Sequence, residues 1–212
     1  MISISGIEYQ KELEQLPYFN KNEAVVLIGK QGKNLDKKIA QLTRIGYLKT
    51  FKKGLYTSSV YADKEVGESY MQFTANILRF PSYISTEYVM ALEGLIPESV
   101  YWVTSITLKS TRKYSNFLGN FSYRNIKNSL FLGFKEKNWN SNIVYIASKA
   151  KALFDYFYFK KMYNTKADIY DTRINWGNFS GDDLLEFDKY VKLSKSIKMK
   201  NIFEILKEDY VS

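Results

Sequence analysis

Residues 34–56 read Asn-Leu-Asp-Lys-Lys-Ile-Ala-Gln-Leu-Thr-Arg-Ile-Gly-Tyr-Leu-Lys-Thr-Phe-Lys-Lys-Gly-Leu-Tyr, and this stretch decides the fold of the N-terminal part of the chain. Leu35, Ile39 and Leu42 recur at steps of four and three residues, which predicts one apolar stripe along a helix. Gly46 can adopt the left-handed backbone conformation that ends a helix. The residues that follow predict two short strands joined by a basic turn.

The outer side of this helix and the hairpin after it are basic. At about 100° per residue, side chains on the face opposite the apolar stripe are cationic or amide-bearing. A cationic helix followed by a cationic hairpin is typical of a winged helix-turn-helix, which binds double-stranded DNA with the helix in the major groove and the wing next to it. The candidate DNA-binding residues are Lys33, Lys37, Lys38, Gln41, Arg44, Lys49, Lys52 and Lys53. An ordinary amphipathic helix with a solvated lysine face is the alternative, and the hairpin favours the winged helix over it.

Composition excludes several classes of protein. Hydrophobic residues make up 45% of the 212 residues and aromatics 17%, which indicates a folded chain. The chain has no cysteine and no histidine, so disulfides, structural zinc, cysteine nucleophiles and histidine bases are excluded. No apolar run approaches the roughly 18 residues of a membrane span, and the N-terminus lacks the pattern of a secretory signal. We therefore expect a cytoplasmic protein with no membrane partner, no cofactor and no metal.

The formal charge of +9 is spread unevenly. Residues 21–53 carry nine basic and two acidic side chains, residues 61–100 two basic and six acidic ones, and residues 101–140 seven basic and one acidic. Two basic segments separated by an acidic one indicate a polyanionic partner that both basic segments contact. The candidate second DNA surface is Lys109, Arg112, Lys113, Arg124, Lys127, Lys135 and Lys137. The alternative is that these residues keep the edges of a sheet from aggregating.

The periodicity predicts an α+β protein of two domains. Residues 1–58 are expected to form the winged helix-turn-helix, with Asn34 capping its third helix. Residues 61–212 are expected to form a mixed helix and antiparallel-sheet domain that ends in helices. Its predicted strands are 101–108, 121–126, 130–134 and 143–146, and its later helices are 147–163, 182–194 and 197–208.

Two windows resemble the AbiEi family of antitoxins. Residues 42–56, with their closing Lys-Lys-Gly-Leu-Tyr, are similar to the wing of that family, and residues 83–97, Tyr-Ile-Ser-Thr-Glu-Tyr-Val-Met-Ala-Leu-Glu-Gly-Leu-Ile-Pro, are similar to the element that opens its second domain. Residues 146–155 resemble a helix start of the family, and the likeness covers about residues 20–160. It implies a type IV, abortive-infection antitoxin that represses its own operon through an N-terminal winged helix. It also implies a C-terminal antitoxin domain that opposes a nucleotidyltransferase-like toxin without a stable complex.

Two other classes of function stay open from the residues alone. An enzyme would depend on the acids Asp155, Asp168, Asp171, Asp182 and Asp183, of which Asp168 and Asp171 have a spacing that can hold magnesium. These acids fit no known nuclease or nucleotidyltransferase signature, so we predict that the protein is not an enzyme. A ligand-sensing one-component winged-helix regulator is the alternative function. Its second domain would hold an apolar pocket lined by Trp102, Trp139 or Trp176.

Overall fold

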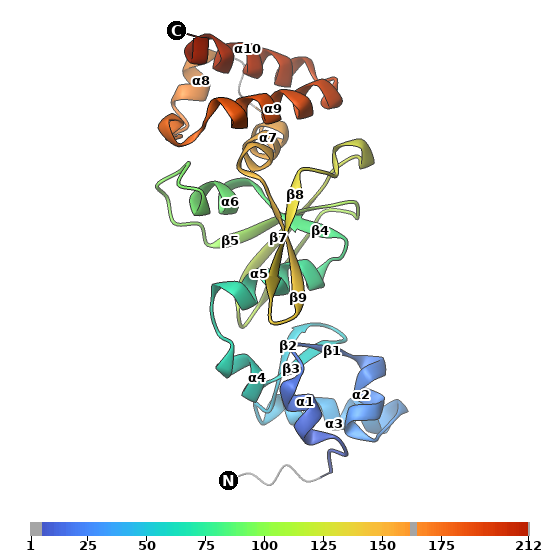
Figure 1. The fold of residues 1–212 in the computed structure, drawn as a ribbon. Helices are drawn as coiled ribbons and strands as arrows, with labels where there is room; N and C mark the ends of the chain where they lie inside the picture. The colour runs from blue at the N-terminus through green and yellow to red at the C-terminus, as the bar shows by residue number, and fades with distance from the viewer. Residues whose placement is uncertain (1–5, 162–164, 212) are drawn as a thin grey trace. The chain divides into compact units, whose positions relative to one another are not determined.

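The structure is a computed structural model that describes residues 6–161 and 165–211 (Figure 1). It is a mixed α+β protein, as the sequence predicts. The chain packs into two compact units: the first contains the residues up to Thr74 together with Tyr114–Gly119, and the second contains Ala75–Lys113 and the residues from Asn120 onward. Among the described residues, no helix has the length and apolar character to cross a membrane.

The first unit consists of short helices around a small antiparallel sheet. Its elements are α1 (Gln10–Gln15), β1 (Phe19–Asn20), α2 (Lys21–Ile28), α3 (Gly32–Arg44), β2 (Leu48–Lys52), β3 (Leu55–Ser58), α4 (Ser59–Lys64) and the first part of α5 (Glu68–Leu78). The strand order is β1-β3-β2. The helical period over residues 35–42 and the hairpin at residues 48–58 are therefore both confirmed.

The ends of α2 and α3 follow from local chemistry. Asn20 caps α2 in a capping box: its side chain accepts hydrogen bonds from the backbone of Asn22 and Glu23, and Glu23 accepts one from the backbone of Asn20. After α3, Gly46 has a φ of 78°, and the N–H of Tyr47 donates to the carbonyl of Leu42 at 2.9 Å. These bonds satisfy groups that would otherwise be unpaired at the helix ends.

The prediction that Asn34 caps α3 is wrong. The helix begins at Gly32 and the capping position is Gln31, whose side chain makes no capping bond. Gly32 has a φ of 57°, a conformation that glycine adopts without strain, and this lets the chain enter the helix three residues early. Asn34 is consequently an exposed residue of the first helical turn.

The second unit is built on a mixed sheet with helices on both faces. After α5 come β4 (Ser82–Ile84), α6 (Thr86–Leu92), β5 (Trp102–Thr107), β6 (Arg112–Asn116), β7 (Gly119–Asn125), β8 (Phe134–Trp139), β9 (Asn142–Ala147), α7 (Lys149–Phe159), α8 (Lys166–Tyr170), α9 (Gly181–Ser194) and α10 (Ile197–Val211). Helices α9 and α10 pack side by side near α7 (Figure 1). The predicted helix 147–163 ends at Phe159, and its last two positions lie outside the described residues.

The expectation of an antiparallel sheet is wrong. The described strands follow the order β6-β7-β5-β4-β9-β8, in which β5 pairs parallel to β7 and β4 parallel to β9. The parallel pair β5/β7 arises because β6 carries the chain back outside β7. The short strand β4 was not predicted, although it lies in the middle of the sheet. The strand predicted at 130–134 is wrong over most of its length: Leu130 ends a 3-10 helix, and only Phe134 belongs to a strand, β8.

The register of the strand pairs shows which side chains lie on each face of this sheet. Tyr83 is paired with Ile106 and Thr104 with Ser122, so these side chains share one face because strand side chains alternate. The hydroxyl of Tyr83 donates to Asp155 of α7, which places α7 on that face. Tyr123 points to the other face and donates to the carbonyl of Ala75 in α5. The end of α5 that belongs to the second unit therefore lies on one face of the sheet, and α7 covers part of the other.

Candidate nucleic-acid interface

The outer side of α3 is a continuous polar and cationic surface. Leu35, Ile39 and Leu42 are 1%, 6% and 1% exposed and pack into the core of the first unit. The side chains on the opposite face reach solvent: Lys33, Lys37, Gln41 and Arg44 are exposed, and Lys38 is half-buried. A rise of about 1.5 Å per residue gives this face a length of roughly 16 Å between Lys33 and Arg44.

The acids near α3 do not neutralise this face. Asp36 forms an ion pair with Lys21 of α2 at 2.6 Å, and Glu23 is engaged in the cap of α2. Within the described part of the chain, no carboxylate forms an ion pair with Lys33, Lys37 or Arg44. The net charge of the α3 surface is therefore positive.

Two further residues, which the sequence analysis did not assign to the DNA surface, belong to it. Lys30 and Asn34 line a shallow cavity of about 230 Å³ together with Lys37, Lys38 and Gln41. Lys30 comes from the turn between α2 and α3, and Asn34 is available because it is not the cap. The signal was present in the spacing, since positions 30, 34, 37, 38 and 41 repeat at three- and four-residue steps.

The three hairpin lysines are not equivalent. Lys53 lies exposed at the turn between β2 and β3, next to Gly54 with a φ of 80°. Lys49 forms an ion pair with Asp63 of α4, and its Nζ is 5.2 Å from the ring of Phe117. Lys52 lies with its Nζ 5.8 Å from the ring of Tyr114. Residues 114–119 of the first unit thus contact two of the three lysines, and of the three only Lys53 is exposed.

The structure does not bring the seven basic residues of the second segment together. Lys109, Arg112, Lys113, Arg124 and Lys127 lie around the neighbouring ends of β5, β6 and β7. By contrast, Lys135 and Lys137 lie on β8, at the opposite edge of the sheet. Register also places these two on the α5 face, opposite Ile146 and Val144, whereas Arg124 is on the α7 face opposite Ile106. Lys127 donates to the carbonyl of Ser194 at the end of α9.

Three of the candidate catalytic acids have structural partners. Asp168 and Asp183 accept hydrogen bonds from the backbone of Thr165 and Ser180 in the capping boxes of α8 and α9. Asp155 is fully buried and is described below. Asp171 ends α8, and Asp182 is exposed in the first turn of α9. Within the described residues, acidic side chains do not gather into a group of three or more that would hold a metal ion.

A buried ion pair lies between the sheet and α7. Lys151 and Asp155 are both 0% exposed, with 2.5 Å between Nζ and Oδ1. The hydroxyls of Ser85 and Tyr83 donate to Oδ2 of Asp155 at 2.8 and 3.1 Å. Nζ of Lys151 is also 4.8 Å from the ring of Phe154. Burial lowers the pKa of Lys151 and raises the pKa of Asp155, and their mutual attraction opposes both shifts.

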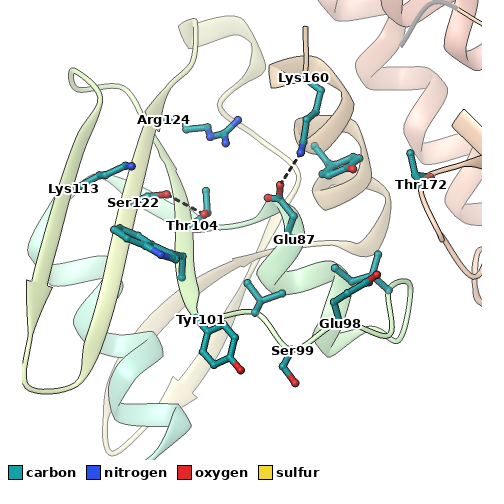
Figure 2. Close-up of a pocket in the computed structure, with 14 residues that line it drawn as sticks. Glu87, Glu98, Ser99, Tyr101, Thr104, Lys113, Ser122, Arg124, Lys160 and Thr172 are labelled. Atoms are coloured by element: carbon teal, nitrogen blue, oxygen red, sulfur yellow. Dashed lines mark hydrogen bonds and ion pairs between the residues drawn. The ribbon is translucent and has the colours of Figure 1, made fainter. Parts of the chain in front are cut away.

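The second unit also contains a pocket of about 540 Å³, here called the strand pocket (Figure 2). Its floor is the α7 face of the sheet, and its walls come from α6, α7 and the segment before β5. It is lined by Glu87, Ile96, Glu98, Ser99, Val100, Tyr101, Trp102, Thr104, Lys113, Ser122, Arg124, Tyr156, Lys160 and Thr172. Of the three tryptophans considered for a ligand pocket, Trp102 lines it, whereas Trp139 and Trp176 do not. Polar and apolar groups contribute about equally to the surface of this pocket, so it is less apolar than the pocket expected of a sensor domain.

Comparison with known proteins returned no matching protein-family model and no matching curated protein.

Proposed function

We propose that the protein is a DNA-binding repressor whose first unit acts as a winged helix-turn-helix. The observation that carries this proposal is the cationic face of α3, which lies directly opposite the buried stripe of Leu35, Ile39 and Leu42. Helices α2 and α3 form the helix-turn-helix, and the β2–β3 hairpin is the wing. No other exposed surface of the described first unit combines a helix of this length with several exposed cations.

The side chains on α3 divide into two roles. Gln41 can bridge the N6 and N7 atoms of adenine, and Arg44 can bind the two acceptors of guanine, so these two residues are proposed to read bases. Lys33, Lys37 and the newly assigned Lys30 are flexible point charges that suit phosphate contacts. On the wing, Lys53 is proposed as the phosphate contact, because Lys49 and Lys52 already have intramolecular contacts.

Arg44→Ala should weaken binding to the operator by roughly 1–3 kcal/mol and binding to random DNA much less. Fluorescence anisotropy with a duplex from the region upstream of the gene measures both affinities at one fixed salt concentration. Lys11→Ala is the matched control, because Lys11 is an exposed cation of α1 in the same unit. If both duplexes lose equal affinity, Arg44 is a phosphate contact and not a base reader.

We further propose that the repressor is the antitoxin of a type IV toxin–antitoxin operon, acting in phage defence. This proposal rests on the resemblance of residues 42–56 and 83–97 to AbiEi antitoxins. In it, residues 1–58 bind the operator and residues 61–212 oppose a nucleotidyltransferase-like toxin without forming a stable complex. Packing groups α4, half of α5 and residues 114–119 with the first unit, so the functional division is best tested in the full-length chain.

A triple variant in which Lys33, Lys37 and Arg44 become alanine separates the two activities. It should no longer repress a reporter fused to the operon's promoter, but it should still protect cells that express the toxin encoded next to it. A pull-down of purified toxin should fail with both the variant and the natural protein. Loss of protection together with loss of repression would contradict an antitoxin activity that resides in residues 61–212.

A ligand-sensing regulator is the second candidate function, and the strand pocket favours it. A small molecule bound there would change the affinity for the operator only if it bound the DNA-competent and incompetent states unequally. Operator affinity measured with and without a ligand of the pocket distinguishes the two candidates. An unchanged affinity would leave the antitoxin proposal and remove the sensor.

A further inference from the structure

We propose that the strand pocket binds a nucleoside phosphate. This inference goes beyond the proposed DNA binding and does not depend on it, because every residue that carries it belongs to the second unit. The cavity of about 540 Å³ lies inside the range of about 300–1,000 Å³ that is usual for small-molecule sites. The chemistry of its walls identifies the class of ligand.

The cations on the sheet side of the pocket have no carboxylate partner. Lys113 extends from β6 and Arg124 from β7 toward the cavity (Figure 2). Within residues 6–161 and 165–208, no acid forms an ion pair with either side chain. Aromatic contacts hold them instead: Lys113 Nζ is 5.0 Å from the ring of Trp102, and Arg124 Cζ is 5.5 Å from that of Phe159. An oriented lysine and arginine without an acid are suited to an anionic group such as phosphate.

The rim of the pocket offers aromatic rings to solvent. Tyr101 is 83% exposed and Trp102 is 36% exposed, although rings of this size are usually better covered. Both line the cavity, and Trp102 lies against Lys113. Stacking of a nucleobase on such rings contributes binding energy with little preference for sequence. A ligand that carries an aromatic ring and an anion would therefore use both features together.

The remaining polar groups fit the sugar and the base edge. On the floor, the hydroxyls of Thr104 and Ser122 are 2.9 Å apart, and each keeps further hydrogen-bonding capacity (Figure 2). Glu98 lies away from Lys113 and Arg124. Its Oε1 is 3.9 Å from Arg173 in an exposed ion pair, and its carboxylate keeps the capacity to accept hydrogen bonds from sugar hydroxyls or amino groups. Glu87 is paired with Lys160 at 3.6 Å. The pocket is thus cationic at one end and accepts hydrogen bonds at the other, the polarity that a nucleoside phosphate requires.

Isothermal titration calorimetry of the full-length protein with AMP, GMP, CMP and UMP tests the proposal. The matching nucleoside and inorganic phosphate serve as the two halves of each ligand. We expect at least one mononucleotide to bind, and its two halves to bind at least about tenfold more weakly. Arg124→Gln and Trp102→Leu should each weaken nucleotide binding by about tenfold, because one removes a charged hydrogen bond and the other a stacking surface.

Lys135→Gln is the matched control, because Lys135 is an exposed cation of the same unit on the opposite sheet edge. Its nucleotide affinity should equal that of the natural protein. Thermal unfolding checks that each variant is folded, and Lys113→Gln replaces Arg124→Gln if the latter does not fold. The proposal is overturned if none of the mononucleotides binds, if binding survives in the arginine or lysine variant, or if only a single-stranded oligonucleotide binds. The α3 triple variant should keep its nucleotide affinity, so failure of either proposal leaves the other testable.

Discussion

At the scale of single residues, Asp155 was considered as a catalytic acid from the sequence, and its contacts in the fold are structural. Its carboxylate is enclosed with Lys151 and accepts hydrogen bonds from Ser85 and Tyr83. Bringing two charges out of water is costly, and their attraction offsets the cost only while both partners and their hydrogen bonds are present. A group that is 0% exposed cannot meet a substrate, so its contribution is to fix α7 on the sheet.

Asp155→Ala should lower the free energy of unfolding by about 3–5 kcal/mol, because Lys151 would stay buried without its counter-ion. Chemical denaturation followed by circular dichroism measures the change. The double variant Lys151→Met with Asp155→Asn is the informative comparison, since it removes both charges and keeps an oxygen for Ser85 and Tyr83. We expect it to be more stable than Asp155→Ala alone. A double variant that is equally unstable would contradict the explanation based on an uncompensated charge.

At the scale of elements, helices and strands that are specified by nearby residues were predicted correctly. Strands that form only by pairing with strands distant in the sequence were missed or misplaced. Helix α3 and its hairpin were predicted because the apolar period, Gly46 and Gly54 act within a few residues. Strand β4 was missed because Ser82–Ile84 is only three residues long and is a strand through its pairing with β5 and β9. Strand β8 was misplaced because its Lys-Glu-Lys-Asn centre lacks the alternation of a half-buried strand.

The residues of the candidate DNA surface also divide into those that the local sequence predicts and those whose contacts depend on distant segments. The exposed face of α3 follows from helical period alone, so its main cations could be named from sequence. The contacts of Lys49 and Lys52 could not, because they involve Asp63, Phe117 and Tyr114, which the fold brings from later segments. The strand pocket was equally hidden, because its lining residues come from elements that are distant in the sequence.

The capping of α2 and α3 gives a prediction at this scale. Asn20→Ala should cost about 1 kcal/mol of stability, within a range of roughly 0.5–2, because two backbone N–H groups of α2 lose their acceptor. Asn34→Ala is the matched control: an exposed asparagine inside the first turn of α3 caps nothing, so its change should stay within about 0.5 kcal/mol. Urea denaturation of both variants measures the difference. A larger loss for Asn34→Ala would restore Asn34 as the cap.

At the scale of the whole molecule, buried tyrosines make stability depend on alkaline pH. Burial raises the pKa of Tyr47, Tyr70 and Tyr190, and for Tyr47 the hydrogen bond to Glu14 raises it further. In the unfolded chain a tyrosine loses its proton near pH 10. The stabilisation from each raised pKa is therefore fully present below about pH 10 and is lost as the pH rises toward the folded-state value.

Tyr47→Phe tests this dependence. At pH 8 the variant should be less stable than the natural protein by about 1 kcal/mol, because the hydrogen bond at 2.7 Å to Glu14 is gone. Between about pH 10 and pH 11.5 the gap should narrow, since phenylalanine has no proton to lose on unfolding. Urea midpoints across this pH range measure the gap. A gap that stays constant would show that Tyr47 does not contribute to the alkaline loss.

The two edges of the large sheet give the last prediction, which concerns the proposed second DNA surface. Five spacings of about 4.8 Å separate β6 from β8, or about 24 Å, which is more than twice the Debye length of roughly 8–10 Å at moderate salt. Basic residues at the two edges therefore do not act as one patch on a short stretch of duplex. We expect Lys109 and Arg112, which lie with Lys113 and Arg124 at the β6 end, to supply the phosphate contacts of this unit.

Neutralising Lys109 and Arg112 together, as glutamines, should reduce the slope of log affinity against log salt by about 1.8, since each phosphate contact contributes about 0.9. The matched pair Lys135→Gln with Lys137→Gln removes the same charge from the opposite edge and should leave the slope unchanged. Base preference should survive in both double variants, because phosphate contacts carry no sequence information. Equal reductions by the two pairs would mean that DNA contacts both edges. Two unchanged slopes would confine DNA binding to the first unit and leave the basic residues of the sheet to the strand pocket and the solvent.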